Sequence, residues 1–232
     1  MSVSELSTST QNYLKAIWGL KEWSSEPVTA TLIAKQLGLK LSSVSDAVRK
    51  MAKQGLVSHT PYGSVELTEL GRQYALVMVR RHRLLESFLV QALGYTWDEV
   101  HNEAENLEHA VSDMLIERVD KFLDYPTRDP HGDPIPTVDG QITIPSAHRL
   151  TDSGAQSQVT VERISDSDPQ LLKFLEERGI VTGAVLSTRE GAPFSDSLEI
   201  QVAGGTQWVV LGRPATDAVF VCLLYTSDAA DE

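Results

Sequence analysis

The stretch Thr29–Gln54, TATLIAKQLGLKLSSVSDAVRKMAKQ, indicates the fold of the N-terminal part of this chain. Its first half has the apolar spacing of a short amphipathic helix, and Gly38 is a typical C-terminal stop. A second helix is predicted from Ser42 to Gln54, with Val44, Ala47, Val48 and Met51 facing inward. Two short helices joined by a tight turn that contains glycine predict a helix-turn-helix.

The segments on either side extend this motif into a winged helix. Residues 10–23 have apolar side chains on one helical face, with Thr10 as the expected N-cap. After the motif, residues 56–59 and 64–68 read as the two strands of a hairpin, with a turn at Tyr62-Gly63. We therefore expect a winged helix-turn-helix DNA-binding domain over residues 1–75.

The second helix of the motif supplies the residues expected to contact double-stranded DNA. The N-terminal residues of a recognition helix meet base edges, and basic residues further along meet phosphates. An ordinary solvent-exposed helix face is the alternative for each Lys or Arg, and an N-cap is the alternative for Ser42. The candidate DNA-binding residues are Lys40, Ser42, Ser43, Ser45, Asp46, Arg49 and Lys50.

The charge of −12 is distributed unevenly along the chain. Residues 1–75 carry eight Lys/Arg and six Asp/Glu, whereas residues 76–232 carry twelve and twenty-six. The first part tolerates a polyanion, and the second part favours cations.

The composition excludes several classes of protein. The sequence contains no run of eighteen apolar residues, so no membrane span is predicted. Residues 1–11 lack a signal-peptide pattern, and we therefore expect a cytoplasmic protein without a membrane partner. Cys222 is the single cysteine, which excludes a disulfide framework and a cysteine-based zinc site.

Two long helices are predicted to follow the winged helix, in a helical domain over residues 76–145. The first runs from Thr68 to about Ala92, where Gly94 follows. The second runs from Thr96 to about Leu123, with Thr96 and Glu99 as a capping box.

These helices carry histidines and carboxylates at helical spacing. His101, Glu105, Glu108 and His109 stand at i, i+4, i+7 and i+8, and therefore share one stripe of a continuous helix. His82 and Glu86 repeat an i, i+4 pair on the preceding helix. Like charges stacked in this way repel one another unless a cation lies between them. One such pair is typical of a solvated helix face, but two on consecutive helices favour a metal site built between helices.

The donor types indicate the class of metal. Without sulfur, mixed imidazole and carboxylate donors suit Mn²⁺, Fe²⁺ or Co²⁺, while Zn²⁺ can bind more tightly in vitro. The sequence predicts a divalent transition-metal site.

The remainder of the chain predicts a small β domain. Residues 126–158 are rich in Pro, Gly, Asp and Ser and read as loop, with a linker over 146–158. Alternating apolar residues over 159–221 predict a five-stranded SH3-like barrel, similar to FeoA, with one helix near 168–178. Residues 222–232 resemble translated adaptor sequence, and we expect a disordered non-native tail there.

Several of these motifs together resemble the iron-dependent or diphtheria-toxin-repressor type of metalloregulator, and most closely its manganese-responsive branch. The resemblance covers about residues 6–221. It rests on Asn12–Ile17, the helix-turn-helix, Arg80–Glu86, Val100–Ala104 with Glu108-His109, and His131–Pro136.

The resemblance implies a homodimer that binds a palindromic operator when loaded with metal. The implied primary site uses Glu105, Glu108 and His109, with Asn12 as a further ligand through its amide oxygen or a water molecule. Iron sensors of the family carry Cys at the position of Glu105, so a carboxylate there implies Mn²⁺. The implied ancillary site uses His82, Glu86 and His101, with Asp168 from the barrel.

The expected function is a Mn²⁺-dependent transcriptional repressor of metal-homeostasis genes, and not an enzyme. Fe²⁺ is the alternative effector. Two other functions remain open from the residues alone: a winged-helix regulator that senses a small organic ligand, and a metal-dependent hydrolase.

Overall fold

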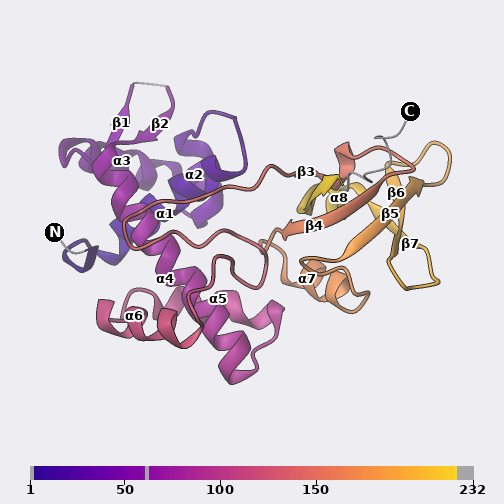
Figure 1. Ribbon diagram of the computed structural model, residues 1–232. Coiled ribbons are helices and arrows are strands. Elements are labelled where there is room, and N and C mark those ends of the chain that lie inside the picture. The colour runs from indigo at the N-terminus through magenta and orange to yellow at the C-terminus, as the bar shows by residue number, and fades with distance from the viewer. Residues whose placement is uncertain (1–2, 61–62, 224–232) are drawn as a thin grey trace, which may run out of the picture. The chain divides into compact units, whose positions relative to one another are not determined.

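The computed structural model describes residues 3–60 and 63–223 (Figure 1). The chain divides into two compact units. The first unit comprises Met1–Leu85, Ala104–Thr127 and Ile135–Ile144, and the second comprises Glu86–Glu103, Arg128–Pro134 and Pro145–Glu232. The elements of the N-terminal and central parts are η1 Val3–Glu5, α1 Thr8–Glu22, α2 Ala30–Leu37, α3 Leu41–Lys53, β1 Val57–His59, β2 Val65–Leu67, α4 Glu69–Leu93, α5 Trp97–Leu107 and α6 Asp113–Phe122. Those that follow are β3 His148–Arg149, η2 Leu150–Asp152, β4 Gln158–Ile164, α7 Pro169–Glu176, β5 Val185–Glu190, β6 Ser197–Val202, β7 Val209–Gly212, α8 Arg213–Ala218 and β8 Val219–Leu223.

The first unit contains the predicted winged helix. Gly38 ends α2 in the left-handed conformation at φ 64°, which glycine adopts without strain. Strands β1 and β2 pair antiparallel beside α3, and residues 61–62 at the tip of the predicted turn lie outside the described residues (Figure 1). Apolar residues of α1, α2, α3 and α4, among them Leu14, Ile33 and Val48, form one buried core. The N-cap of α1 is Ser7 and not Thr10, because the Ser7 hydroxyl accepts the Thr10 N–H.

The single helix expected from Thr96 to Leu123 is two helices. α5 ends at Leu107, and a turn over residues 108–110 precedes α6, whose N-cap Ser112 accepts the Leu115 N–H. Arg81 on α4 holds this turn, since its guanidinium donates to the Glu108 carbonyl and forms an ion pair with Asp113 at 2.5 Å. Glu108 and His109 therefore lie in the turn and not on the helical stripe that the spacing predicted.

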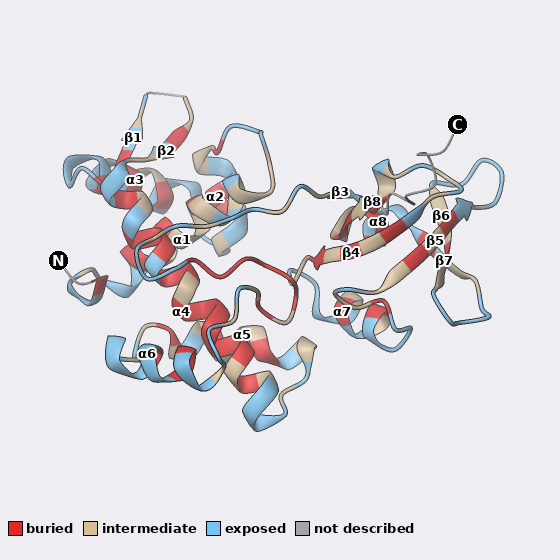
Figure 2. Cartoon of the chain, viewed as in Figure 1, coloured by how far each residue is buried: buried red, intermediate tan, exposed pale blue. Residues whose placement is uncertain are grey.

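The second unit contains the predicted β domain as a six-stranded antiparallel sheet in the order β3-β8-β4-β5-β6-β7. The sequence predicted five strands and missed α8. Buried residues of the strands and of α7, including Val159, Leu172 and Val219, form its core (Figure 2).

Strand β8 corrects the expected start of the tail. Cys222 and Leu223 belong to β8, where Cys222 pairs with Thr160 and Leu223 with Val159 of β4. The rest of the predicted tail, residues 224–232, lies outside the described residues. No helix in the described part of the chain is long and apolar enough to cross a membrane.

Candidate metal centre

The primary cluster lies within the first unit and is built on α1, α4 and the C-terminal end of α5. We define it by Lys15, His82, Glu105, Glu108 and His109. Glu108 is fully buried at its centre, with Oε2 2.6 Å from His82 Nδ1 and Oε1 2.7 Å from Lys15 Nζ. Lys15 Nζ also contacts Glu105 and lies 3.4 Å from His82 Nδ1. The Lys15 ammonium group thus lies among the oxygen and nitrogen donors, where its positive charge neutralises the two carboxylates.

The charges around Glu108 keep it ionised. Burial raises the pKa of Glu108, but the hydrogen bond from His82 and the charge of Lys15 outweigh burial and hold the pKa below its ordinary 4.5. Glu108 is therefore a carboxylate at neutral pH, as a metal ligand must be.

His109 is held in the form that can bind a metal. Gln11 on α1 donates its amide hydrogens to the carbonyls of Val3 and Leu6, so its Oε1 is left to accept from His109 Nδ1 at 2.7 Å. This hydrogen bond leaves a lone pair on Nε2, which lies 3.5 Å from Glu108 Oε1. Burial lowers the pKa of His109 below 6.5, against the opposing charge of Glu108, so the ring is neutral at pH 7.

Asn12, three residues before Lys15 on α1, has a buried side-chain oxygen, Oδ1, without a hydrogen-bond partner among the described residues. Buried amide oxygens are rarely left without a partner, so this atom indicates a ligand that completes it. Asn12 and Lys15 stand at i, i+3 on α1 and therefore on one helical face. The donor set of carboxylates, imidazoles and an amide oxygen fits a divalent transition metal.

The ancillary cluster lies within the second unit and consists of Glu86, His101 and Asp166. Glu86 is almost fully buried near the end of α4, His101 lies on α5, and Asp166 lies between β4 and α7. His101 Nδ1 is 3.3 Å from Glu86 Oε1 and 3.1 Å from Asp166 Oδ2. Burial lowers the pKa of His101, but hydrogen bonds and charge from Asp166 and Glu86 prevail and raise it from 6.5 to about 10. The imidazole is therefore the cation of this cluster.

One sequence-based assignment differs from this arrangement. Asp168, the expected ligand from the barrel, is the N-cap of α7 and accepts the N–H groups of Gln170 and Leu171. Asp166, two residues earlier, takes the place beside His101. His82 Nδ1 lies against Glu108 of the primary cluster, and the expected role of His82 in the ancillary site stays a prediction. The sequence also gave no role to Lys15 or Gln11, although both lie within one turn of Asn12.

The candidate DNA-binding residues lie together on α3 of the first unit. Lys40 precedes the helix, and all of these residues are exposed except the half-exposed Ser45. Ser45 donates to the Leu41 carbonyl, and Asp46 forms an ion pair with Arg49 on the same helix. Lys50 remains exposed beside them, so this face of α3 presents hydroxyls and positive charge to solvent.

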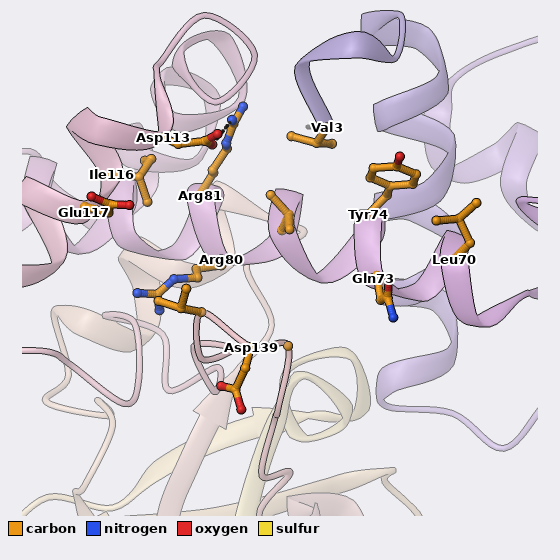
Figure 3. A pocket seen from close by; sticks show the side chains of 13 residues that line it. Val3, Leu70, Gln73, Tyr74, Arg80, Arg81, Asp113, Ile116, Glu117 and Asp139 are labelled. Atoms are coloured by element: carbon orange, nitrogen blue, oxygen red, sulfur yellow. Dashed lines mark hydrogen bonds and ion pairs between the residues drawn. The ribbon is translucent and has the colours of Figure 1, made fainter. Parts of the chain in front are cut away.

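A groove of about 560 Å³ runs along α4 in the first unit (Figure 3). Val3, residues of α4 and α6, and the loop 138–140 line it. Figure 3 shows Arg81 reaching Asp113 at one end and Leu70 at the other. Val77 of α4, which lines the groove, and Met114 and Leu115 of α6 are exposed large apolar residues, so this region has the character of a protein interface.

A winged helix joined to clusters of His and carboxylate donors defines a metal-dependent DNA-binding regulator, and comparison with known families agrees. Three family models match the chain: the iron dependent repressor N-terminal DNA binding domain over residues 5–65, the iron dependent repressor metal binding and dimerisation domain over 68–137, and the FeoA domain over 148–222.

Similar proteins include the iron-dependent repressor IdeR of Mycobacterium bovis. It is 35% identical over 194 residues, which cover 78% of this chain and 84% of the relative. The diphtheria toxin repressor of Corynebacterium efficiens is 38% identical over 58% of each chain. A solved manganese-dependent transcriptional repressor in complex with manganese is 48% identical, has a TM-score of 0.88 and covers 93% of this chain and all of that one.

The chain belongs to the iron-dependent repressor family, which includes the diphtheria toxin repressors. It is a metal-dependent transcriptional repressor and not an enzyme, so the hydrolase alternative is discarded.

Proposed function

We propose that this protein is a Mn²⁺-dependent repressor that binds palindromic operator DNA as a homodimer and controls metal-homeostasis genes. The primary cluster carries the proposal, because it gathers donors from α4 and from the end of α5 around Lys15 of α1, in the same unit as the winged helix. The ligands proposed there are Glu105, Glu108 and His109, with Asn12 and with His82 beside Glu108.

The choice of Mn²⁺ rests on the hard donors of the cluster. Glu105 contributes a carboxylate where a thiolate would favour softer metals, and no cysteine lies among the clustered residues. The similar structure at 48% identity is that of a manganese-dependent repressor, whereas IdeR is iron-dependent and another neighbour, ScaR, has been solved with Zn²⁺. Mn²⁺ is therefore the proposed effector, and Fe²⁺ is the competing one.

The residues of the cluster indicate how metal binding can change the position of the DNA-binding helix. A bound divalent ion would supply positive charge among the donors of α4 and the end of α5. The Lys15 ammonium then gives up its contacts with Glu105 and Glu108, since it cannot share their oxygens with a divalent cation. Lys15 and Asn12 lie on α1, which packs on α2 within the core that also holds α3. A change in α1 is therefore passed to the helix-turn-helix through packed side chains.

The proposed dimer draws on two observations. The matched domain over residues 68–137 is described as a metal binding and dimerisation domain. The groove on α4, with Val77, Met114 and Leu115 exposed near it, offers an apolar surface that a second copy could cover. Two recognition helices related by a dyad would read a palindromic operator.

A binding titration tests the proposal. A high-affinity duplex is first selected from random-sequence DNA with saturating Mn²⁺, and its affinity is then measured in Mn²⁺ and in EDTA. We expect about 100-fold tighter binding in Mn²⁺, within the usual range of coupling between two sites. Glu26→Gln, at an exposed carboxylate outside the clusters, serves as the control. Equal affinity in Mn²⁺ and EDTA would refute the proposal.

A further inference from the structure

Asp46 is the one acidic residue in a segment that is otherwise basic. Residues 27–63, which contain the helix-turn-helix and β1, carry five Lys/Arg and this single Asp. DNA phosphates repel a carboxylate, so an acid on a DNA-binding face weakens binding unless it makes a favourable contact of its own. The chemistry of that contact follows from the position and the hydrogen bonds of Asp46.

Asp46 lies on the exposed face of α3, in the N-terminal half of the helix. Val44, Val48 and Met51 are at most 1% exposed and form the buried face. Asp46 follows Ser42 by one helical turn, and its side chain is 72% exposed. The N-terminal part of a recognition helix is the part that reaches base edges in the major groove. Asp46 is therefore placed to meet a base.

The ion pair between Asp46 and Arg49 orients the carboxylate. Arg49 Nη2 donates to Asp46 Oδ1, and Arg49 Nε donates to the Ser45 carbonyl at 3.4 Å. The Arg49 side chain is 70% exposed, and pairs so open to solvent contribute little to stability. Helix stability therefore gives no sufficient reason for an acid at this position. The guanidinium charge does reduce the repulsion between Asp46 and the phosphates.

The hydrogen-bonding capacity of Asp46 differs from that of its neighbours on this face. Ser42 and Ser43 carry hydroxyls, which donate or accept and so discriminate poorly between base edges. A carboxylate only accepts, and it has about four acceptor positions, so the bond from Arg49 leaves others for DNA. In the major groove cytosine presents the N4 amino donor, whereas guanine and thymine present acceptors that repel a carboxylate. Adenine presents a donor beside an acceptor, which is a poorer match.

We infer that Asp46 is a specificity-determining residue that reads a cytosine in each half-site of the operator, by accepting a hydrogen bond from the cytosine N4 amino group. Arg49 is the positioning residue for this contact. The assignment rests on the proposed function, because it takes the DNA to be an operator of defined sequence. It deepens that function by naming a base that the operator contains.

Selection from random-sequence DNA tests the assignment. It is run in Mn²⁺ and in EDTA, so that its readout does not depend on which metal state binds DNA. Wild type should select a cytosine at one position of each half-site. Asp46→Asn should select adenine there, because Asn pairs with adenine N6 and N7, and Asp46→Ala should show no preference. Glu26→Gln, which removes an exposed carboxylate outside α3, is the matched charge control and should retain cytosine.

Removal of the amino group from the DNA tests the same contact directly. In the selected duplex, 2-pyrimidinone replaces the cytosine and so lacks the N4 amino group. Because this change also weakens the base pair, the loss of affinity is compared between two proteins by fluorescence anisotropy. The loss should be about tenfold larger for wild type than for Asp46→Ala, within the range of one base contact.

Non-specific binding separates base reading from a structural role of the ion pair. On DNA without the selected site, Asp46→Asn should bind a few-fold more tightly than wild type, because a repulsive charge is removed. A purely structural role would instead weaken binding to every sequence alike.

Cytosine retained by both folded variants, Asp46→Asn and Asp46→Ala, would overturn the assignment and leave operator binding intact. A wild-type selection without any sequence preference would refute both the assignment and the proposed operator.

Discussion

The primary and ancillary clusters both contain buried carboxylates, but a different kind of cation neutralises them in each cluster. In the primary cluster, Lys15 supplies the cation that neutralises Glu105 and Glu108. In the ancillary cluster the cation is His101, with its pKa raised to about 10 by Asp166 and Glu86 despite its burial. A lysine must move aside for a metal ion, whereas a histidine must lose a proton and can then become a ligand. On the proposed function, the first cluster therefore couples metal binding to the position of a helix, and the second couples metal binding to pH.

The largest expected effect separates the two clusters by their control of DNA binding. Glu108→Gln should reduce operator affinity in Mn²⁺ by about 100-fold, close to the metal-free value, because Glu108 contacts both Lys15 and His82. Glu86→Gln should cost only about tenfold, because its cluster lies outside the unit that holds the winged helix. Fluorescence anisotropy with labelled operator measures both. Equal losses would remove the distinction between the clusters.

The two clusters should also differ in how their Mn²⁺ affinity depends on pH. Mn²⁺ binding at the ancillary cluster must displace the proton of His101, so its apparent affinity should fall about tenfold for each pH unit below about 10. The primary cluster should respond less between pH 7 and 8.5, because the pKa values of Glu108 and His109 are both lowered. Mn²⁺ titrations of Glu108→Gln and His101→Gln, which disable one cluster each, isolate the two dependences. Parallel pH profiles would contradict the comparison.

The same raised pKa predicts the pH dependence of stability without metal. Since the folded-state pKa of His101 lies above its ordinary 6.5, its stabilisation is complete below pH 6.5 and is lost as pH rises through about 10. Urea unfolding in EDTA should show wild type losing stability relative to His101→Gln across this window. A constant difference would show that His101 is not the cation of the ancillary cluster.

Lys15→Met should act in opposite directions on metal binding and on metal-free stability. Without the competing ammonium, the primary cluster should bind Mn²⁺ about tenfold more tightly, which is about 1.4 kcal/mol. The metal-free protein should lose about 1–3 kcal/mol, because Glu108 remains buried without that partner. Calorimetry and unfolding in EDTA check the two effects. Lys21→Met, at an exposed lysine of α1, should change neither.

The sequence predicted most of the elements but not the geometry of the clusters. The helix-turn-helix, the wing and α4 follow from local patterns, and Gly38 marked the end of α2 correctly. The break between α5 and α6 was missed, because the stop at Leu107 depends on Arg81 of another helix holding the turn. The helical stripe nevertheless selected His101, Glu105, Glu108 and His109, since a turn leaves neighbours in sequence close in space. The family resemblance then divided these residues between two sites.

Residues distant in sequence were harder to assign. Asp166 and Asp168 differ by two positions, and only the N-cap of α7 determines that Asp168 bonds to the backbone. Lys15 reads as an ordinary surface lysine until α1 packs beside α4. Its spacing from Asn12 was the available signal, since both occupy one face of α1.

The smallest expected effect lies on α3, which both clusters are proposed to control. Lys50→Ala should weaken operator binding a few-fold and reduce the salt dependence by about one charge, in line with a single phosphate contact. The ratio of affinities in Mn²⁺ and EDTA should not change, because Lys50 touches neither cluster. A change in that ratio would place Lys50 in the coupling rather than in the DNA contact.

Diffraction from crystals grown with Mn²⁺, recorded at the manganese absorption edge, locates the effector ion itself. We expect an anomalous peak bounded by Glu105, Glu108 and His109, with the Lys15 ammonium displaced from both carboxylates. Lys15 still bridging Glu105 and Glu108, with no peak at these residues in crystals soaked to saturation, would show that the primary cluster is not the metal site.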